Sequence, residues 1–201
     1  MNISAVLLAG GESRRMGQDK ATLVFHGKPL WEIQLDVLRE LHLREIFLSA
    51  RNDPMWRPAD VHFVPDQTPS RGPLSGLAAA LWRIRTDHLL VLAIDMPLMT
   101  KDFLHSLCGA IKPSCGVVPM IGDHLEPLAA IYPKGADADV IAALSGHDFS
   151  LQSLAERLIA VDKLRLVSVS SEDVNCFRNF NEPDDFVEKS EQTISGASPG
   201  C

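Results

Sequence analysis

Glycine and basic residues crowd into a short segment near the start of the chain. An apolar run over residues 3–8 is followed by Gly10 and Gly11, by Arg14 and Arg15, and then by Gly17 and Lys20. Paired glycines let the backbone approach a ligand closely, and backbone N–H groups together with Arg and Lys side chains bind phosphate oxygens. The segment therefore predicts a polyphosphate-binding loop. The competing interpretation is a turn with solvated arginines.

The spacing of these residues differs from that of two common nucleotide-binding loops. A Walker A loop places Lys and then Ser or Thr directly after its last glycine, whereas here Gln18 and Asp19 follow Gly17. A dinucleotide fingerprint needs the pattern Gly-x-Gly-x-x-Gly, which glycines at positions 10, 11 and 17 do not form. Both loop classes are therefore excluded.

Two carboxylates each follow an apolar run that reads as a strand. Asp66 comes after residues 61–64, and Asp95 ends the most apolar run of the chain, residues 87–94. Because burying a bare carboxylate is costly, Asp95 must be solvated, paired or bound to a metal ion such as Mg²⁺. The alternative for Asp95 is a cap on the following turn, and the alternative for Asp66 is an ion pair with Arg71.

Strand-like and helix-like segments alternate along the chain. Strands are expected at 3–8, 45–49, 61–64, 87–94 and 164–170, helices at about 30–41, 73–84, 100–111, 137–144 and 150–158, and a hairpin at 116–132. This order predicts an α/β fold, a Rossmann-like three-layer αβα sandwich with a mainly parallel sheet and a small antiparallel hairpin portion. Because ligands bind at the carboxyl ends of parallel strands, the glycine loop, Asp66 and Asp95 should meet at one rim.

Composition excludes some partners. The chain has 201 residues with a formal net charge of −7, which argues against a general binder of nucleic acid or of anionic membranes. No apolar run approaches the length of a membrane span and no secretory signal is visible, so we expect a cytoplasmic protein. His105, Cys108 and Cys115 lie near one another in sequence, but buried thiols explain the cysteines better than a zinc site does.

Five groups of residues, among them Asp95-Met96-Pro97, resemble the MobA-like NTP transferase family. The opening segment carries its pattern Leu-Ala-Gly-Gly-x-x-x-Arg-Met-Gly-x-Asp-Lys, from Leu8 to Lys20. The same resemblance extends over the Gly-Pro-Leu-x-Gly segment at 72–76, the Pro-Leu-x-Ala-x-Tyr strand at 127–132, and the Asn-rich ending at 177–185. It implies a single nucleotidyltransferase domain over residues 1–189. Residues 190–201, rich in Ser and Gly, are expected to be a disordered tail.

The resemblance implies a role for individual residues of this chain. Lys20, Arg15 and Asp95 would be catalytic, with Asp95 as the Mg²⁺ ligand, and Asn179 and Asn181 would bind the acceptor. Ser49 stands where the family often has an Asn that contacts the nucleotide. The full set implied to bind the nucleotide is Leu8, Ala9, Gly10, Gly11, Lys20, Ser49, Asp66, Gly72, Pro73, Leu74 and Asp95.

The resemblance also implies a reaction. GMP would pass from GTP to the terminal phosphate of molybdopterin or molybdenum cofactor, with release of pyrophosphate. The Leu-Ala-Gly-Gly form goes with guanine in this family, and cytidylyltransferase relatives carry an Ala-Ala-Gly form. Cofactor-delivery proteins or acceptor molybdoenzymes are possible partners. The alternatives are an NTP transferase that uses CTP or another nucleotide, one that acts on a different phosphate or sugar phosphate, and a nucleotide-binding regulator without turnover.

Overall fold

The computed structural model describes residues 2–10, 19–66, 69–181 and 185. Within them, one large sheet is built from β1 (Ile3–Leu8), β4 (Ile46–Ala50), β5 (His62–Pro65), β6 (His88–Ala93), β7 (Gly116–Ile121), β8 (His124–Leu125), β9 (Ala129–Pro133) and β10 (Leu164–Ser168). The strand order is β10-β7-β9-β6-β1-β4-β5, and β8 pairs with β7. Four of the pairings, β6–β1, β1–β4, β4–β5 and β7–β10, are parallel.

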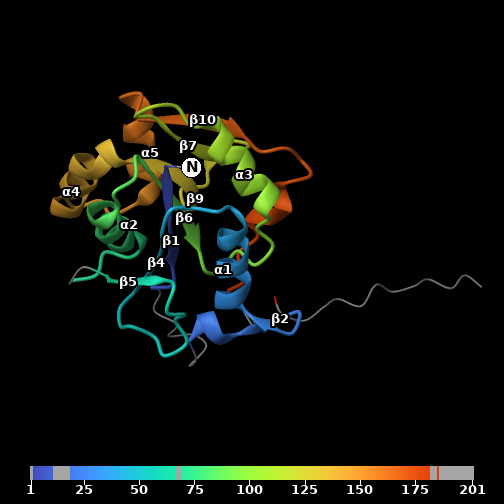
Figure 1. The fold of residues 1–201 in the computed structure, drawn as a ribbon. Coiled ribbons are helices and arrows are strands. Elements are labelled where there is room, and N and C mark those ends of the chain that lie inside the picture. The colour runs from blue at the N-terminus through green and yellow to red at the C-terminus, as the bar shows by residue number, and fades with distance from the viewer. Residues whose placement is uncertain (1, 11–18, 67–68, 182–184, 186–201) are drawn as a thin grey trace, which may run out of the picture.

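Helices cover both faces of this sheet (Figure 1). One face carries α1 (Leu30–Glu40) and α3 (Lys101–Ala110), and the other carries α2 (Pro73–Arg83), α4 (Asp137–Ser145) and α5 (Leu151–Ala160). The smaller elements are the 3-10 turns η1 (Lys20–Thr22), η2 (Lys134–Ala136) and η3 (Val174–Phe177) and a hairpin of β2 (Val24–Phe25) and β3 (Lys28–Pro29). This three-layer arrangement confirms the predicted fold class.

The apolar strands fold in the middle of the sheet because both of their faces are buried. In β6 the side chains of Leu90 and Leu92 join the cluster under α1 and α3, while those of Leu89 and Val91 join the cluster under α2, α4 and α5. Successive side chains of a strand point to opposite faces, so an uninterrupted apolar run supplies both cores at once. The carboxyl ends of β1 and β6 are thereby fixed side by side, with Leu8 opposite Ala93.

Strand β9 is where the sheet departs from parallel pairing. The predicted hairpin is present, because Val117 of β7 pairs antiparallel with Ile131 of β9. β9 also pairs antiparallel with β6 along its length, so it lies between β6 and β7 instead of at an edge. The alternating segment predicted as an edge strand is β10, which does end the sheet.

Two predictions concern a membrane span and the C-terminal tail. No helix in the described part of the chain is both long and apolar enough to span a membrane. The predicted tail at 190–201 lies outside the described residues.

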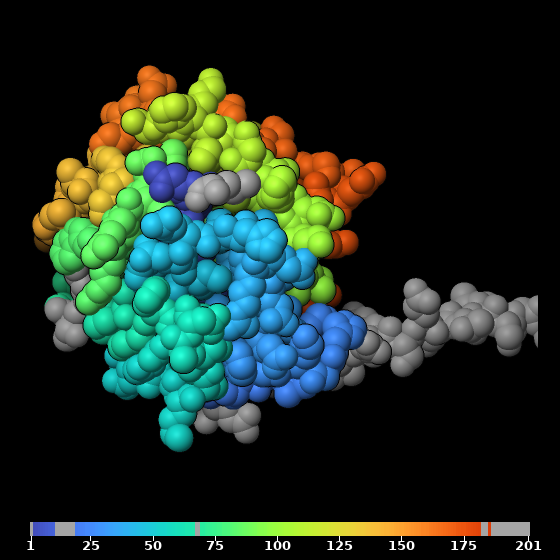
Figure 2. Space-filling view, viewed as in Figure 1, coloured from blue at the N-terminus to red at the C-terminus, as the bar shows by residue number. Residues whose placement is uncertain are grey.

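The space-filling view shows the blue segment of β2, β3 and α1 against the cyan segment that follows β4, on one face of the molecule (Figure 2).

Candidate functional site

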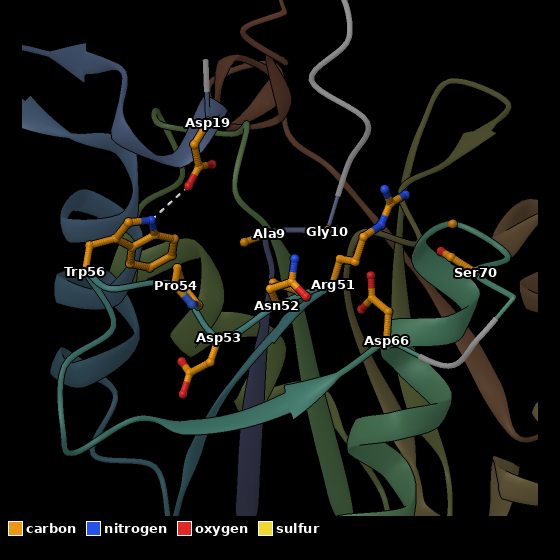
Figure 3. A pocket seen from close by; sticks show the side chains of 12 residues that line it. Ala9, Gly10, Asp19, Arg51, Asn52, Asp53, Pro54, Trp56, Asp66 and Ser70 are labelled. Atoms are coloured by element: carbon orange, nitrogen blue, oxygen red, sulfur yellow. Dashed lines mark hydrogen bonds between the residues drawn. The ribbon is translucent and has the colours of Figure 1, made fainter. Parts of the chain in front are cut away.

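A pocket of about 650 Å³ lies at the carboxyl ends of β1, β4 and β5. Its lining comes from three connections, namely Ala9 and Gly10 after β1, residues 50–54 at and after the end of β4, and Asp66, Ser70 and Gly72 between β5 and α2. Asp19 and Trp56 complete it on the side opposite Asp66 and Ser70 (Figure 3). The site therefore forms where the parallel strands were expected to deliver it.

Asp66 is held in place by Ser49 from the neighbouring strand. The Ser49 hydroxyl donates to Oδ1 of Asp66 at 2.6 Å, and Ser49 itself is 1% exposed. A Cβ atom on Gly10 would lie only 2.3 Å from Oδ2 of Asp66. A side chain at position 10 would therefore displace the Asp66 carboxylate, and Ser49 orients Asp66 without lining the pocket.

A second polar cluster forms around Lys20, the residue that follows Asp19 of the pocket. The ammonium group of Lys20 donates to Oδ2 of Asp95 at 2.9 Å and to Oδ1 of Asn181 at 2.6 Å. The backbone N–H of Phe180 donates to the carbonyl oxygen of Asp95 at 2.8 Å, which ties the segment carrying Asn181 to the end of β6. Three predicted site residues thus meet from positions far apart in the sequence.

One oxygen of Asp95 has no hydrogen-bond partner among the described residues. Oδ1 is buried, while Oδ2 accepts from Lys20. An unpartnered carboxylate oxygen suits a hard cation such as Mg²⁺, which takes oxygen ligands and keeps several waters. Among the described residues, no group of three or more His, Cys, Asp and Glu side chains could hold a metal ion. Among the described residues, Oδ1 of Asp95 is therefore an oxygen that could serve such a cation as a ligand.

The loop before α2 presents its backbone to the pocket. Gly72 lines the pocket and Pro73 begins the helix, whereas Leu74 is fully buried in the core below.

The guanidinium carbon of Arg71 lies 4.2 Å from the ring centroid of Phe149. Arg71 is therefore held on that ring, and the alternative in which Asp66 pairs with Arg71 is wrong.

Gly76 allows α2 to approach the strands that deliver the site. A Cβ atom at this position would lie 2.7 Å from Cδ2 of Leu8 and 2.7 Å from the hydroxyl oxygen of Ser49. The last glycine of the Gly-Pro-Leu-x-Gly segment is thus explained by packing between helix and sheet.

Several lining residues were not among the predicted site residues. Asn52 lies in the pocket, and Ser49, the residue aligned with the family's Asn, does not. Trp56 also lines it, and its indole N–H donates to Oδ2 of Asp19 at 2.9 Å. The sequence offered only a weak signal for this loop, since Asn52, Asp53 and Pro54 read as the end of a strand.

The remaining predicted residues fall into two groups. Leu8 is buried with its side chain toward α2, and Ala9 lines the pocket. Asn179 is exposed, two residues before Asn181, which contacts Lys20. Gly11, Arg14 and Arg15 lie outside the described residues. Their predicted roles in phosphate binding and catalysis therefore stay predictions.

Comparison with known proteins gives a consistent match. A protein from Opitutus terrae named "probable molybdenum cofactor guanylyltransferase" is 35% identical over 91% of this chain and 92% of its own length. A "molybdenum cofactor guanylyltransferase" from Syntrophotalea carbinolica is 32% identical over 91% of this chain and 88% of its own. The crystal structure of "molybdopterin-guanine dinucleotide biosynthesis protein A" from Archaeoglobus fulgidus has a TM-score of 0.75 at 25% identity, covering 91% of this chain and 94% of that one.

The family model described as the MobA-like NTP transferase domain matches residues 5–163. That span contains most of β1, the pocket, Lys20 and Asp95, so the match includes the strands that build the site as well as the polar residues near it. With the pocket, the Lys20–Asp95 pair and the relatives in agreement, the chain belongs to the MobA-like NTP transferase family and is a nucleotidyltransferase.

Proposed function

We propose that this protein transfers GMP from GTP to the terminal phosphate of molybdopterin or molybdenum cofactor, releasing pyrophosphate and forming the guanine dinucleotide cofactor. The observation that carries the proposal is the Lys20–Asp95 pair, because Lys20 directly follows Asp19, which lines a pocket large enough for a nucleotide. The names of the relatives support the choice of nucleotide and acceptor.

The nucleotide occupies the pocket between β1 and the loop before α2. Ala9 and Gly10 offer backbone groups at its floor, and Asp66 and Asn52 offer polar side chains. A carboxylate accepts hydrogen bonds and does not donate them, so Asp66 suits the N–H groups of guanine or the hydroxyls of ribose. Ser49 keeps Asp66 in this orientation.

Lys20 is placed to act on the phosphates. An oxygen of the acceptor phosphate attacks the α-phosphorus of GTP, the bond from that phosphorus to the oxygen bridging to the β-phosphate breaks, and pyrophosphate leaves with the bond electrons. The positive charge of Lys20 stabilises the charge that develops in this step. Asp95 is the residue that would hold Mg²⁺, which when bound supplies further positive charge to phosphate oxygens.

The reaction needs no general base in the protein. A phosphomonoester has a second pKa of about 6, so the acceptor is largely a dianion at neutral pH and is already nucleophilic. The chain's task is to align the acceptor with the α-phosphorus and to neutralise charge. We assign Asn181, which accepts from Lys20, and Asn179 to the acceptor.

The test is a panel of GTP, CTP, ATP and UTP with Mg²⁺ and molybdopterin, with and without molybdate, read as pyrophosphate release. The proposal predicts release with GTP, and equal turnover of CTP and GTP would overturn the choice of base. Release only with hexose 1-phosphates as acceptors would indicate a sugar-phosphate enzyme. Nucleotide binding with no release for any acceptor would indicate a regulator.

A further inference from the structure

The short 3-10 turn that carries Lys20 is closed by Asp19. Oδ1 of Asp19 accepts from the backbone N–H of Ala21 at 3.0 Å, and the Asp19 carbonyl oxygen accepts from the hydroxyl of Thr22 at 2.8 Å. Asp19 is the N-cap of the turn, so its position sets where the turn starts and in which direction Lys20 leaves it.

The other oxygen of Asp19 is bound by a residue from a distant loop. The indole N–H of Trp56 donates to Oδ2 of Asp19 at 2.9 Å, across 37 positions of sequence. The Trp56 ring is stacked on the ring of Trp31 in α1, with centroids 5.4 Å apart and planes 14° apart. Figure 3 shows the Trp56–Asp19 bond at the edge of the pocket, so Trp56 touches the pocket, α1 and the cap of the Lys20 turn at once.

We propose that Trp56, acting through Asp19, is a positioning residue for Lys20 and couples the pocket to it. The kinetic part of this inference rests on the proposed function, and the structural part does not. A Trp N–H is a neutral donor, so it orients the Asp19 carboxylate without adding charge. The Lys20 ammonium group itself is bound by Asp95 and Asn181. A ligand that displaces Trp56 in the pocket would move the cap and, with it, Lys20.

The matched variants are Trp56→Phe and Trp31→Phe. Each loses the same indole ring and keeps an aromatic ring in the stack, but only Trp56 supplies the hydrogen bond to Asp19. Asp19→Asn is a second variant at the other end of the bond. Its amide oxygen can still cap Ala21, and its NH₂ group cannot accept from the indole.

The direct readout is the rate at which an amine-modifying reagent labels Lys20 in the ligand-free protein, followed by mass spectrometry. The side chain of Lys20 is 19% exposed and held by two partners, which slows labelling. We expect Trp56→Phe and Asp19→Asn to raise the Lys20 rate by roughly threefold to tenfold, the range set by losing one hydrogen bond. Trp31→Phe should leave it unchanged, with Lys28 and Lys101 as references within each sample.

Kinetics provide a second readout that a general loss of stability would not reproduce. With GTP and acceptor, Trp56→Phe should lower kcat by roughly 10- to 100-fold, because a displaced catalytic group costs about this much. In a Lys20→Ala background the same substitution should have no further effect on kcat, since Trp56 acts through Lys20.

The outcomes separate the two proposals. An unchanged Lys20 labelling rate in both Trp56→Phe and Asp19→Asn would overturn the coupling, as would an equal loss of kcat with and without Lys20. If the unmodified protein fails to transfer GMP, the proposed function is wrong, and the labelling rates still decide whether Trp56 positions Lys20.

Discussion

The ammonium group of Lys20 lies 2.9 Å from a carboxylate oxygen of Asp95, although 75 positions of sequence separate the two residues. Lys20 begins the turn after the glycine-rich segment, and Asp95 stands two residues beyond the end of β6. β1 and β6 are paired in parallel register, so the two connections that follow them leave the sheet at the same rim. The opposite charges are thereby held together at the place where phosphates would bind.

Substitution of Asp95 tests this arrangement. Asp95→Asn keeps the size of the side chain and removes its charge, so it should lower the rate of pyrophosphate release by roughly 10²- to 10³-fold, the usual effect of removing one group that organises transition-state charge. The melting temperature should change little, because one carboxylate oxygen has no partner among the described residues and the Asp95 side chain as a whole is only partly buried. Unfolding of both Asp95→Asn and Asp95→Ala would show that Asp95 is structural.

Ser49 should affect nucleotide affinity through Asp66. Ser49→Ala removes the hydroxyl that donates to Asp66 at 2.6 Å and leaves the carboxylate free to turn. A hydrogen bond to a charged group contributes about 1.5–3 kcal/mol, so the KM for GTP should rise by roughly 10- to 100-fold with a smaller change in kcat. Steady-state kinetics over a range of GTP concentrations measure both. A fall in kcat at constant KM would contradict the assignment of Asp66 to the nucleotide.

Gly10 provides a complementary test at the other oxygen of Asp66. In Gly10→Ala the new Cβ would sit 2.3 Å from Oδ2, so the Asp66 side chain must move away. Because that side chain ends in the pocket and is partly exposed, the cost should appear in GTP binding more than in stability. Titration calorimetry with GTP and thermal unfolding distinguish the two. Unchanged GTP affinity in Gly10→Ala would argue that Asp66 does not contact the nucleotide.

The positions of the strands and of the two aspartates were predictable from sequence, because they depend on local apolar runs. Residues 3–8 and 87–94 are apolar enough to require burial on both faces, and a parallel sheet then brings Asp66 and Asp95 to one rim. The fold class follows from the same alternation of strands and helices.

Other features depend on contacts that no local pattern encodes. Trp56 reaches Asp19 only because the loop after β4 folds back over the Lys20 turn, and Ser49 faces Asp66 only because β4 and β5 are adjacent. The insertion of β9 between β6 and β7 is likewise a choice among pairings with similar local sequence signals. Leu74 belongs to a family motif, yet its burial shows that packing of α2 accounts for it.

Cys108 should make stability depend on pH in the alkaline range. Burial raises the pKa of its thiol from 9.0 to about 11, so the folded state favours the neutral thiol. The contribution of Cys108 to the free energy of unfolding is therefore fully present below pH 9 and is lost as the pH rises through 11. The total loss is about 2–3 kcal/mol, since one pKa unit corresponds to about 1.36 kcal/mol. Burial also raises the pKa of Tyr132, which adds to the loss above pH 10.

The contribution of Cys108 can be isolated by urea unfolding at pH 8 and pH 10.5. Cys108→Ala should lower stability at pH 8, because Cys108 packs in the core, but should lose less between the two pH values than the unmodified protein does. Equal losses in the two proteins would show that the Cys108 thiol ionises as easily in the folded chain as in the unfolded one.

The most direct test of the account is transfer of the α-phosphate itself. GTP labelled at the α-phosphorus is incubated with the protein, Mg²⁺ and molybdopterin, and the label is followed into the acceptor, in parallel with Lys20→Ala. We expect label to enter the pterin product, and Lys20→Ala to reduce this incorporation by at least about 10²-fold. Label that stays in GTP or GMP, or incorporation that does not depend on Lys20, would contradict it.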